Sequence, residues 1–422
     1  MDNTDLNKGK DSLKRAFIIS WILGLIFYFL EYVARSSPAV MIPELSANLK
    51  ISTLAVSSVL GTYYYTYSVT SLIAGISLDR FGARYPITIG VATLCLGCLI
   101  FASHSIFLGD LGRLLQGAGS AFAFTGCVYL ASHGFAAKYL ATAIGFTQCV
   151  GMLGGSVGQF AVGPMIHGGI SVGLFWPGMA VLCGIICVLL YLTVPKEKPN
   201  PENKKNMAGI LMPYKIVFSN PQSYLSGMIS GLLFAPTTIF AMTWGVAFLQ
   251  HDRMYSYSNA VLVCSMVPLG WVIGCPLIGW ISDVMGKRKP VISLSISVMI
   301  LCFAQLIYMP QMISPIITML LFGTASGAAM IPYSIIKESN PDKVKGSATG
   351  AINFITFGIT AILGPIFSRL YGKTLETGID HEKHFSGAGN FMLIVMAAAL
   401  IVSLIIHETG QKAEHAQRLY RS

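Results

Sequence analysis

The stretch Gly75–Arg84 reads GISLDRFGAR, and Gly279–Arg288 repeats its pattern as GWISDVMGKR. Both copies follow a long apolar run, and both place Gly, Asp, Gly and Arg at the same offsets. Two further pairs of segments also resemble each other: 140–146 with 347–354, and 163–164 with 364–365. The spacing is 204 residues for the first pair, 75–84 with 279–288, and about 205 and 201 residues for the other two. Because unrelated resemblances would not share a spacing, we predict that the chain is a duplication of one membrane unit.

The composition is that of a membrane protein. Of 422 residues, 54% are hydrophobic, 11% are charged and 43 are Gly, whereas soluble domains carry about 25% charged residues. Glycine is frequent in membrane helices because small residues let two backbones approach closely. The first apolar run begins at Ala16 and is too long for the apolar region of a signal peptide, so we expect no cleavable signal. The sequence predicts an all-α membrane protein.

Several site classes are not expected. All nine cysteines lie inside apolar runs, which argues against a disulfide framework. No segment has metal-ligand spacing or resembles a P-loop, so we expect no metal, no cofactor and no use of ATP. The net charge of +10 could indicate nucleic acid. However, most Lys and Arg residues lie in loops on the face of the N-terminus, as is typical of cytoplasmic loops, so we expect a lipid bilayer and no nucleic acid as partner.

Twelve runs are long enough to cross a bilayer: 16–41, 53–77, 85–106, 109–132, 138–166, 172–194, 220–249, 257–281, 290–309, 314–336, 346–371 and 387–407. The polar stretch Pro195–Asn206 predicts a flexible linker between spans six and seven. The expected organisation is an N-terminal six-helix half (1–195), a cytoplasmic linker (196–219) and a C-terminal six-helix half (220–422). The distribution of Lys and Arg predicts that both termini are cytoplasmic.

These features together resemble the major facilitator superfamily: twelve spans in two related halves, a basic central loop, and the pattern GxxxDRxGxR between spans two and three. In span four, Arg113–Gly119 reads RLLQGAG and resembles that family's RxxQGxG motif. The resemblance implies two pseudo-symmetric halves that rock about a central site, for which a monomer is sufficient.

The resemblance also implies that the repeated loop is a gating latch, in which a carboxylate caps a neighbouring helix and pairs with basic groups. The alternative is a solvated charge cluster set by topology alone. Val284 stands in the second copy where the first has Arg80, which weakens the comparison at one position. The expected gating residues are Asp79, Arg80, Arg84, Asp283, Lys287 and Arg288.

Span one carries two charges, Glu31 and Arg35. Charges inside a span are costly and normally face a cavity or a partner. Their i, i+4 spacing puts them on one helix face, in the favourable order for pairing. One interpretation is an ion pair that supports only local structure. The other is that Arg35 binds a substrate carboxylate or another anion, while Glu31 carries a proton or binds an ammonium group.

The segment Tyr28–Met41, YFLEYVARSSPAVM, resembles the first span of anion:cation symporters. It also resembles the amino-acid and small-nutrient importers of intracellular bacteria called phagosomal transporters. The resemblance places that family's arginine at Arg35 and its acid at Glu31. It implies no particular substrate.

Arg113 is a third charge inside a span, beside Gln116. A buried guanidinium needs an acceptor, and both Asp110 and Glu31 are candidates. In the superfamily this arginine is linked to proton coupling, which the resemblance implies for Arg113. The alternative is a structural arginine held by carbonyl groups.

Further substrate-binding candidates are polar or aromatic residues inside other spans. Tyr64 and Tyr67 share a helix face, although an aromatic run is also typical of an interface belt. Pro236 should interrupt span seven and free backbone carbonyls. In the second half the candidates are Trp244, Tyr333 and Asn353, although polar residues there also mediate helix contacts.

We therefore expect a secondary active transporter for a small polar or anionic solute, such as an amino acid, a short peptide or a carboxylate. Proton-coupled import through a bacterial inner membrane fits best. The alternatives are an exporter, an exchanger or a uniporter of the same fold, acting on organic anions or drugs. A sensor is less expected because receptors of this type usually carry long soluble extensions. An enzyme is not expected because no nucleophile and base are arranged for catalysis.

Overall fold

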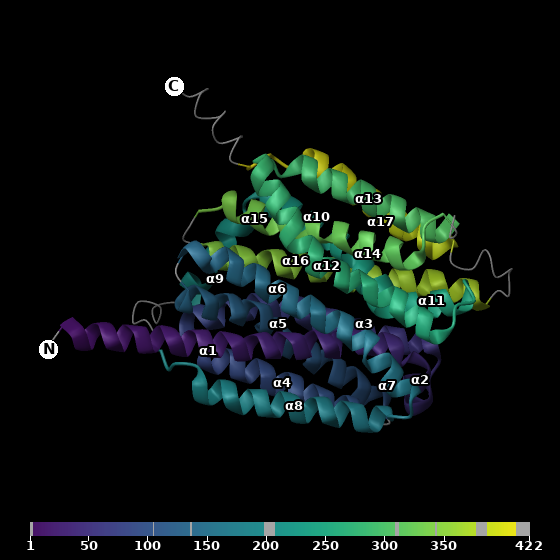
Figure 1. Cartoon of the computed structure of the whole chain (residues 1–422), viewed down its shortest axis with the longest axis horizontal. Helices are drawn as coiled ribbons and strands as arrows, with labels where there is room; N and C mark the ends of the chain where they lie inside the picture. The colour runs from purple at the N-terminus through teal and green to yellow at the C-terminus, as the bar shows by residue number, and fades with distance from the viewer. Residues whose placement is uncertain are drawn as a thin grey trace.

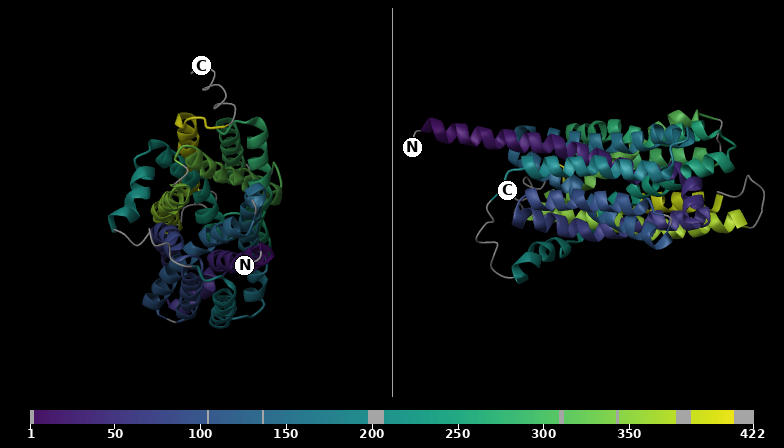
Figure 2. Two further views of the ribbon diagram at one scale, coloured as in Figure 1. Left: turned by 90° about the vertical axis from the view of Figure 1, so that its left-hand side faces the viewer. Right: turned by 90° about the horizontal axis from the view of Figure 1, so that it is seen from below.

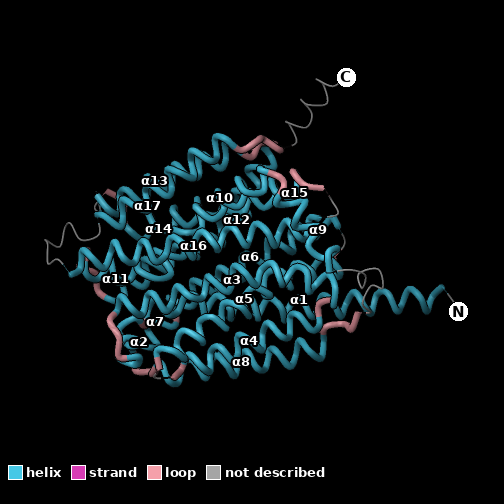
Figure 3. The backbone as a smooth tube through the Cα atoms, turned by 180° about the vertical axis from the view of Figure 1, so that it is seen from behind, coloured by secondary structure: helices cyan, strands magenta, loops and turns pink. Residues whose placement is uncertain are grey.

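The computed structural model describes residues 3–103, 105–135, 137–197, 207–308, 312–341, 344–376 and 386–410. Within these ranges all regular structure is helical, and mostly short loops join the helices (Figure 3). A helix satisfies its own backbone N–H and C=O groups, which is why apolar runs of this length become helices in lipid. The predicted all-α fold class is confirmed.

Six long helices form the first half of the chain, and they run along a common axis (Figures 1 and 2). They are α1 (Asn3–Ser36), α3 (Thr53–Phe81), α4 (Arg84–Phe101), α5 (Ile106–Gly134), α6 (Ala137–Phe160) and α8 (Val172–Thr193). Three short helices lie at the end of the bundle opposite the N-terminus, which we call the far end: η1 (Ser37–Val40), α2 (Ile42–Leu49) and α7 (Val162–His167).

The second half forms a similar bundle, which lies above most of the first in Figure 1. Two of its spans are built from three consecutive helices each. The first consists of α10 (Pro221–Ala235), η3 (Pro236–Trp244) and α11 (Gly245–His251), and the second of α14 (Pro315–Ser326), η4 (Gly327–Met330) and α15 (Ile331–Glu338). The other long helices are α12 (Tyr257–Met285), α13 (Lys289–Tyr308), α16 (Lys345–Glu376) and α17 (Ser386–Ile405).

Eleven helical segments within the described residues are long and apolar enough to cross a membrane. They are Ser12–Val40, Arg84–Phe101, Ile106–Gly134, Ala143–His167, Val172–Thr193, Pro221–His251, Tyr257–Met285, Lys289–Tyr308, Pro315–Glu338, Gly346–Tyr371 and Gly387–Ile405. Helix α3 has 29 residues and is not among them. Its four tyrosines at 63–65 and 67, with its many Ser and Thr residues, make it more polar than the others.

Span seven changes its helical pitch where the sequence predicts an interruption. Pro236 has no N–H to donate, and the chain continues as a π-helix from Pro236 to Trp244. Gln159 of the first half donates a hydrogen bond from Nε2 to the Ala241 carbonyl in this segment, at 2.5 Å. A carbonyl of the π-helix is therefore used for a contact between the halves.

The two halves meet along two helix pairs, α3 with α16 and α6 with α12. Ser68 Oγ donates to the Phe354 carbonyl at 2.7 Å, and Ser156 Oγ donates to the Ser265 carbonyl at 3.0 Å. At the far end, the Tyr257 hydroxyl donates to the Val40 carbonyl at 2.6 Å. The halves are thus joined both beside the site described below and at the far end.

Helix α9 (Met207–Phe218) lies within the segment predicted as the linker, 196–219. Its Tyr214 hydroxyl donates to the Leu72 carbonyl of α3 at 3.0 Å. A Cβ placed on Gly350 of α16 would lie 2.7 Å from the same hydroxyl oxygen. The second part of the linker segment therefore packs against both halves. The middle of the linker, 198–206, lies outside the described residues.

Candidate functional site

Two glycines let the helices that carry the predicted site approach one another. A Cβ on Gly117 of α5 would lie 2.0 Å from the Tyr63 carbonyl of α3, and one on Gly154 of α6 would lie 2.3 Å from the Phe29 carbonyl of α1. Any larger residue would push these backbones apart. The Gly in the RLLQGAG segment therefore brings α5 against the part of α3 that contains Tyr63.

Glu31 and Arg35 form a buried ion pair, as their spacing predicts. Arg35 Nη2 donates to Glu31 Oε1, and the Tyr63 hydroxyl donates to the same carboxylate oxygen. Arg35 Nε in turn contacts the Tyr63 hydroxyl oxygen at 3.1 Å. The exposed fractions are 0% for Glu31 and Tyr63 and 2% for Arg35. The three side chains form a closed cluster across α1 and α3, which we call the central triad.

Four aromatic rings surround the guanidinium of Arg35. Its central carbon lies 4.3 Å from the ring centroid of Tyr32, 4.7 Å from that of Tyr67, and 5.2 Å from those of Tyr63 and Phe357. Phe357 belongs to α16, so the cage includes both halves. Cation–π attraction is strongest when the cation is desolvated, as it is here. The cage therefore holds Arg35 where the halves meet.

The pair still has unused hydrogen-bonding capacity. Glu31 Oε2 and Arg35 Nη1 are buried and have no hydrogen-bond partner among the described residues. Ser120 Oγ of α5 is in the same condition. A buried polar atom without a partner costs about 1–3 kcal/mol, and more when it is charged. Such atoms are where a ligand gains most from binding.

Arg113 also lies against the Tyr63 ring, with its guanidinium carbon 4.8 Å from the ring centroid. It donates to Gln116 Oε1 at 2.7 Å and to the carbonyls of Ala34 at 3.3 Å and Leu60 at 3.4 Å. These acceptors match the structural interpretation rather than the two candidate carboxylates. Arg113 thus links α5 to α1 and α3, and it contacts the central triad through an aromatic face.

The remaining predicted binding residues fall into two groups. Tyr67 belongs to the Arg35 cage, and the Tyr64 ring lies parallel to that of Phe357 with centroids 6.2 Å apart. In contrast, the Tyr333 hydroxyl donates to Asn353 Oδ1, and Tyr333 packs in a separate cluster with Tyr214. The sequence interpretation names Tyr64 and Tyr67 on α3 but not Tyr63, and it does not include Tyr32 or Phe357.

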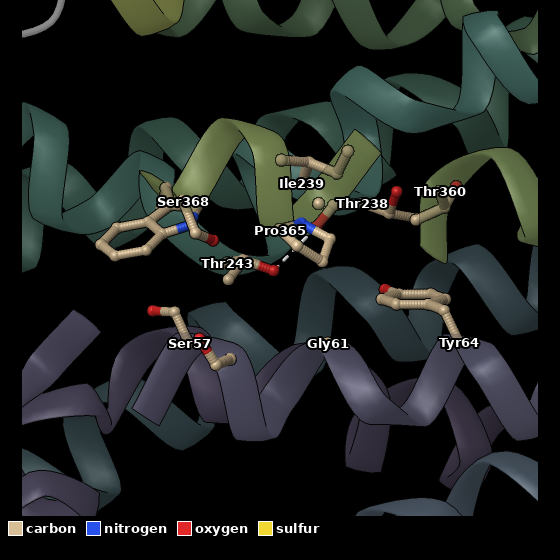
Figure 4. A pocket seen from close by; sticks show the side chains of 12 residues that line it. Ser57, Gly61, Tyr64, Thr238, Ile239, Thr243, Thr360, Pro365 and Ser368 are labelled. Carbon is tan, nitrogen blue, oxygen red and sulfur yellow. Dashed lines mark hydrogen bonds between the residues drawn. The ribbon is translucent and has the colours of Figure 1, made fainter. Parts of the chain in front are cut away.

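A small cavity is lined by Tyr64, whose ring lies parallel to that of Phe357 in the cage (Figure 4). Its volume is about 30 Å³, and residues of α3 and α16 face each other across it. Trp244 lines it and donates from Nε1 to Ser368 Oγ at 3.2 Å. A cavity of this size holds only a few water molecules, so it has no room for an organic solute. The lining residues are Ser57, Ser58, Gly61, Tyr64, Thr238, Ile239, Thr243, Trp244, Thr360, Gly364, Pro365 and Ser368.

The second copy of the repeated loop forms a network around Arg288. Its Nη1 donates to Asp283 at 2.5 Å, and its Nη2 donates to Glu338 at 2.8 Å. The carboxylate that caps the following helix is Glu408, which accepts from the backbone N–H groups of Arg288 at 2.7 Å and Lys289 at 3.0 Å. Burial acts to lower the pKa of Arg288, but the hydrogen bonds to Glu338 and Asp283 outweigh it and raise the pKa above its ordinary value. The backbone carbonyl of Lys287 accepts a hydrogen bond from Ser282 Oγ at 3.2 Å.

The first copy has a similar cap from another segment. Glu197 Oε2 accepts from the Ala83 N–H at 3.1 Å and from the Tyr129 hydroxyl at 3.0 Å. Arg84 donates from Nε to the Tyr191 carbonyl at 2.7 Å, and its guanidinium lies over the Tyr191 ring. Arg80 lies in the last turn of α3. Asp79 is a predicted gating residue, but its side chain is not among the parts that the structure describes. The sequence interpretation missed Glu197, which follows α8, and Glu408, which follows α17.

No group of three or more His, Cys, Asp or Glu residues in the described ranges could hold a metal ion. The nine cysteines are all free.

Comparisons with known proteins agree with this architecture. The family model described as Major Facilitator Superfamily matches residues 24–365. A probable hexose phosphate transport protein of Chlamydia trachomatis is 22% identical and aligns over 94% of this chain and 91% of its own length. The membrane sensor protein UhpC of Escherichia coli is 25% identical, over 93% of this chain and 91% of its own.

The fold is also that of a solved transporter. The crystal structure of a mutant of nucleoside transporter NupG covers 92% of this chain and 99% of its own, with a TM-score of 0.71 and 17% identity. With eleven candidate spans, the chain is a multi-pass integral membrane protein of bacterial type. The family match covers most of its length, which confirms the resemblance seen in the sequence: the chain belongs to the Major Facilitator Superfamily.

Proposed function

We propose that this protein is a secondary active transporter that imports a small organic anion together with protons. The observation that carries this proposal is the central triad, which lies buried where the two halves meet. Arg35 is the anion-binding residue, Glu31 is the proton carrier, and Tyr63 links them. Tyr67 and Tyr64 line the route on α3, while Trp244, Tyr333 and Asn353 contribute from the second half.

The chemistry follows from competition for one guanidinium. In the closed state Glu31 occupies Arg35 as an internal anion. Breaking a buried ion pair by removing one partner costs about 3–5 kcal/mol, because the other charge is left unpaired. An arriving anion can replace the carboxylate at Arg35 if Glu31 takes up a proton at the same time. Proton and anion uptake are then coupled, since neither state leaves a buried charge without a partner.

The substrate class we propose is a hydroxylated organic anion bearing a phosphate or a carboxylate. A guanidinium binds either group with paired hydrogen bonds. The similarity to a probable hexose phosphate transport protein supports a sugar skeleton. Arg113, held by carbonyl groups, positions Tyr63 and stabilises this part of the site.

The topology we propose counts α3 as a twelfth span, because it lies among the other spans and has 29 residues. The halves are 1–195 and 220–422, joined by the linker 196–219, and the monomer transports. Both termini and the loops with Asp79, Arg80, Arg84, Asp283, Lys287 and Arg288 face the cytoplasm of a bacterial cell. The far end then faces outward, and the two loops gate the cytoplasmic side.

The test uses purified protein in proteoliposomes with an internal pH indicator. Glucose 6-phosphate, glucuronate and a set of amino acids are supplied outside, with Glu31→Gln and Arg35→Ala measured in parallel. We expect one anion to acidify the interior and Glu31→Gln to abolish acidification. Anion uptake without proton movement, unchanged in Glu31→Gln, would overturn the coupling role of Glu31.

A sensor is the second candidate function, because the sensor UhpC aligns over 91% of its own length without a long extension. The expectation that receptors of this type carry long soluble extensions therefore does not exclude a sensor. Binding of glucose 6-phosphate by the purified chain, with no uptake of labelled compound in proteoliposomes, would favour it.

A further inference from the structure

A second, larger cavity lies between the halves at the far end. Its volume is about 310 Å³, ten times that of the small cavity beside the cage. Ligand pockets typically measure about 300–1,000 Å³, so this cavity has room for a small solute where the other does not. Its walls come from η1, α2 and the start of α3 in the first half, and from η3, α11, α12 and α16 in the second.

The hydrogen-bonding side chains that line this cavity are hydroxyl, amide, imidazole and indole groups: those of Thr53, Gln250, His251, Tyr257, Tyr371 and Trp244. Among the described residues the lining contains no Lys, Arg, Asp or Glu, and the rest of it is aliphatic. An anion would find no permanent positive charge here. Amide and hydroxyl groups beside aromatic faces suit a hydroxylated ring, whose hydroxyls form hydrogen bonds while its C–H groups pack against the electron-rich faces.

Contacts within the walls hold these groups in place. The Tyr257 hydroxyl lies 2.6 Å from the Val40 carbonyl and 3.3 Å from that of Gly163, so it joins α12 to two elements of the first half. The Tyr371 hydroxyl donates to Asp252 Oδ2 at 3.0 Å. Gln250 has no such contact among the described residues, and its amide is available to a ligand.

Trp244 lines both cavities, and it is the one described residue that their linings share. Its indole is fixed on one side by the hydrogen bond to Ser368 and on another by the Tyr371 ring, 4.9 Å away at 71°. Movement of this one side chain would connect the large cavity to the small one and then to Tyr64 beside the Arg35 cage.

We propose that the large cavity, which we call the outer vestibule, is a second binding site that receives the hydroxylated part of the solute before its anionic group reaches Arg35. This inference rests on the proposed transport function and topology. Recognition is then divided in space: the vestibule selects the neutral sugar part, Trp244 borders both compartments, and Arg35 selects the charge.

The test is protection of an introduced thiol in the reconstituted full-length chain. Ala247 lines the vestibule and is partly exposed, so Ala247→Cys should react with a membrane-impermeant thiol reagent. Met254→Cys is the matched control, because Met254 is 80% exposed in the loop after α11 and does not line the cavity. The unmodified chain measures the background of the natural cysteines.

Glucose, glucose 6-phosphate and glucuronate are the probes. We expect all three to slow labelling of Ala247→Cys at similar concentrations, and none to slow labelling of Met254→Cys. Protection should persist when Arg35→Ala is added. Absence of protection by all three, or protection by the anions alone that disappears with Arg35→Ala, would overturn the vestibule.

A second variant, Gln250→Leu, tests the outer vestibule by a transport measurement. Gln250→Leu removes the amide but keeps most of the volume, and it should raise KM for glucose 6-phosphate about tenfold, the effect of one lost hydrogen bond, with the maximal rate unchanged. An unchanged KM would count against the vestibule. The proposed function fails separately, if Arg35→Ala transports glucose 6-phosphate as well as the parent chain does.

Discussion

Glu197 and Glu408 make the same contact in the two halves of the chain. Glu197 follows α8 and Glu408 follows α17. Each carboxylate accepts hydrogen bonds from backbone N–H groups at the start of another helix, at Ala83 before α4 for Glu197 and at Arg288 and Lys289 of α13 for Glu408. A helix N-terminus has unpaired N–H groups and a partial positive charge, which favours a carboxylate. The likeness of the two repeated loops thus extends to a contact that the loop pattern itself does not contain.

Replacing these caps should destabilise the protein unequally. Loss of an N-terminal cap costs about 0.5–2 kcal/mol. Glu408→Ala should lower the thermal unfolding midpoint in detergent more than Glu197→Ala, because Glu408 caps two helix N–H groups and Glu197 caps one. Lys287→Ala, an exposed change in the same loop, is the control. Equal midpoints for all three variants would contradict the capping role.

Arg288→Lys should weaken the loop network although it keeps the charge. Arg288 binds Asp283 and Glu338 at once through two nitrogens, and a lysine ammonium does not reproduce that planar geometry. The pKa of Arg288 is raised, so its contribution would be lost only above that pKa, far outside the working range of pH. We therefore expect a loss of about 1 kcal/mol in unfolding free energy that is the same at pH 6 and pH 8. A loss that differs between these pH values would show that another group controls the network.

Tyr63→Phe should impair transport without disturbing the aromatic cage. The substitution removes the hydroxyl that contacts both Glu31 and Arg35 and keeps the ring that contacts Arg35 and Arg113. A lost hydrogen bond to a buried charged group costs about 1.5–3 kcal/mol, which corresponds to roughly a 10- to 150-fold loss in uptake.

The matched control is Tyr65→Phe, because Tyr65 is 44% exposed and lies on another face of the same helix. Uptake of glucose 6-phosphate into proteoliposomes distinguishes the two variants. If both lost the same activity, the Tyr63 hydroxyl would have no special role.

Phe357→Leu tests whether the second half acts on Arg35 through its ring. Leucine keeps an apolar side chain at this position but removes the aromatic face that lies 5.2 Å from the guanidinium carbon. Cation–π attraction contributes about 0.5–2 kcal/mol, so uptake should fall by roughly 2- to 30-fold. Phe367→Leu, a buried phenylalanine further along α16, is the control for general packing effects. If Phe367→Leu reduced uptake more than Phe357→Leu does, the loss would be explained by poorer packing of α16 and not by the lost ring at Arg35.

Much of the architecture was predictable from the sequence. The membrane class, the all-α fold and the family depend on long apolar runs and on a repeated loop, and both can be read from neighbouring residues. The pairing of Glu31 with Arg35 was also predictable as one of two interpretations, because residues four apart on one helix must lie on the same face. The change from α-helix to π-helix at Pro236 was predictable as an interruption, because the missing N–H of proline acts on its own helix.

Other parts of the site depended on how distant helices pack. Periodicity shows which residues share a face, but it does not show what faces them. For this reason the sequence interpretation names Tyr64 but not Tyr63 as a binding candidate, and it does not name Phe357 of α16. The acceptors of Arg113 are backbone carbonyls of α1 and α3, which carry no signature in the sequence.

By itself, the sequence determined that this is a membrane protein of the Major Facilitator Superfamily with a charged pair in its first span, and it predicted a duplication. These properties follow from composition, repeat spacing and helix periodicity, which act within single segments. Only the tertiary structure decided that Tyr63 completes the triad, that Phe357 joins the cage, and that Glu197 and Glu408 cap the loops. Each of these contacts joins residues from different helices, and its geometry exists only after the helices have packed.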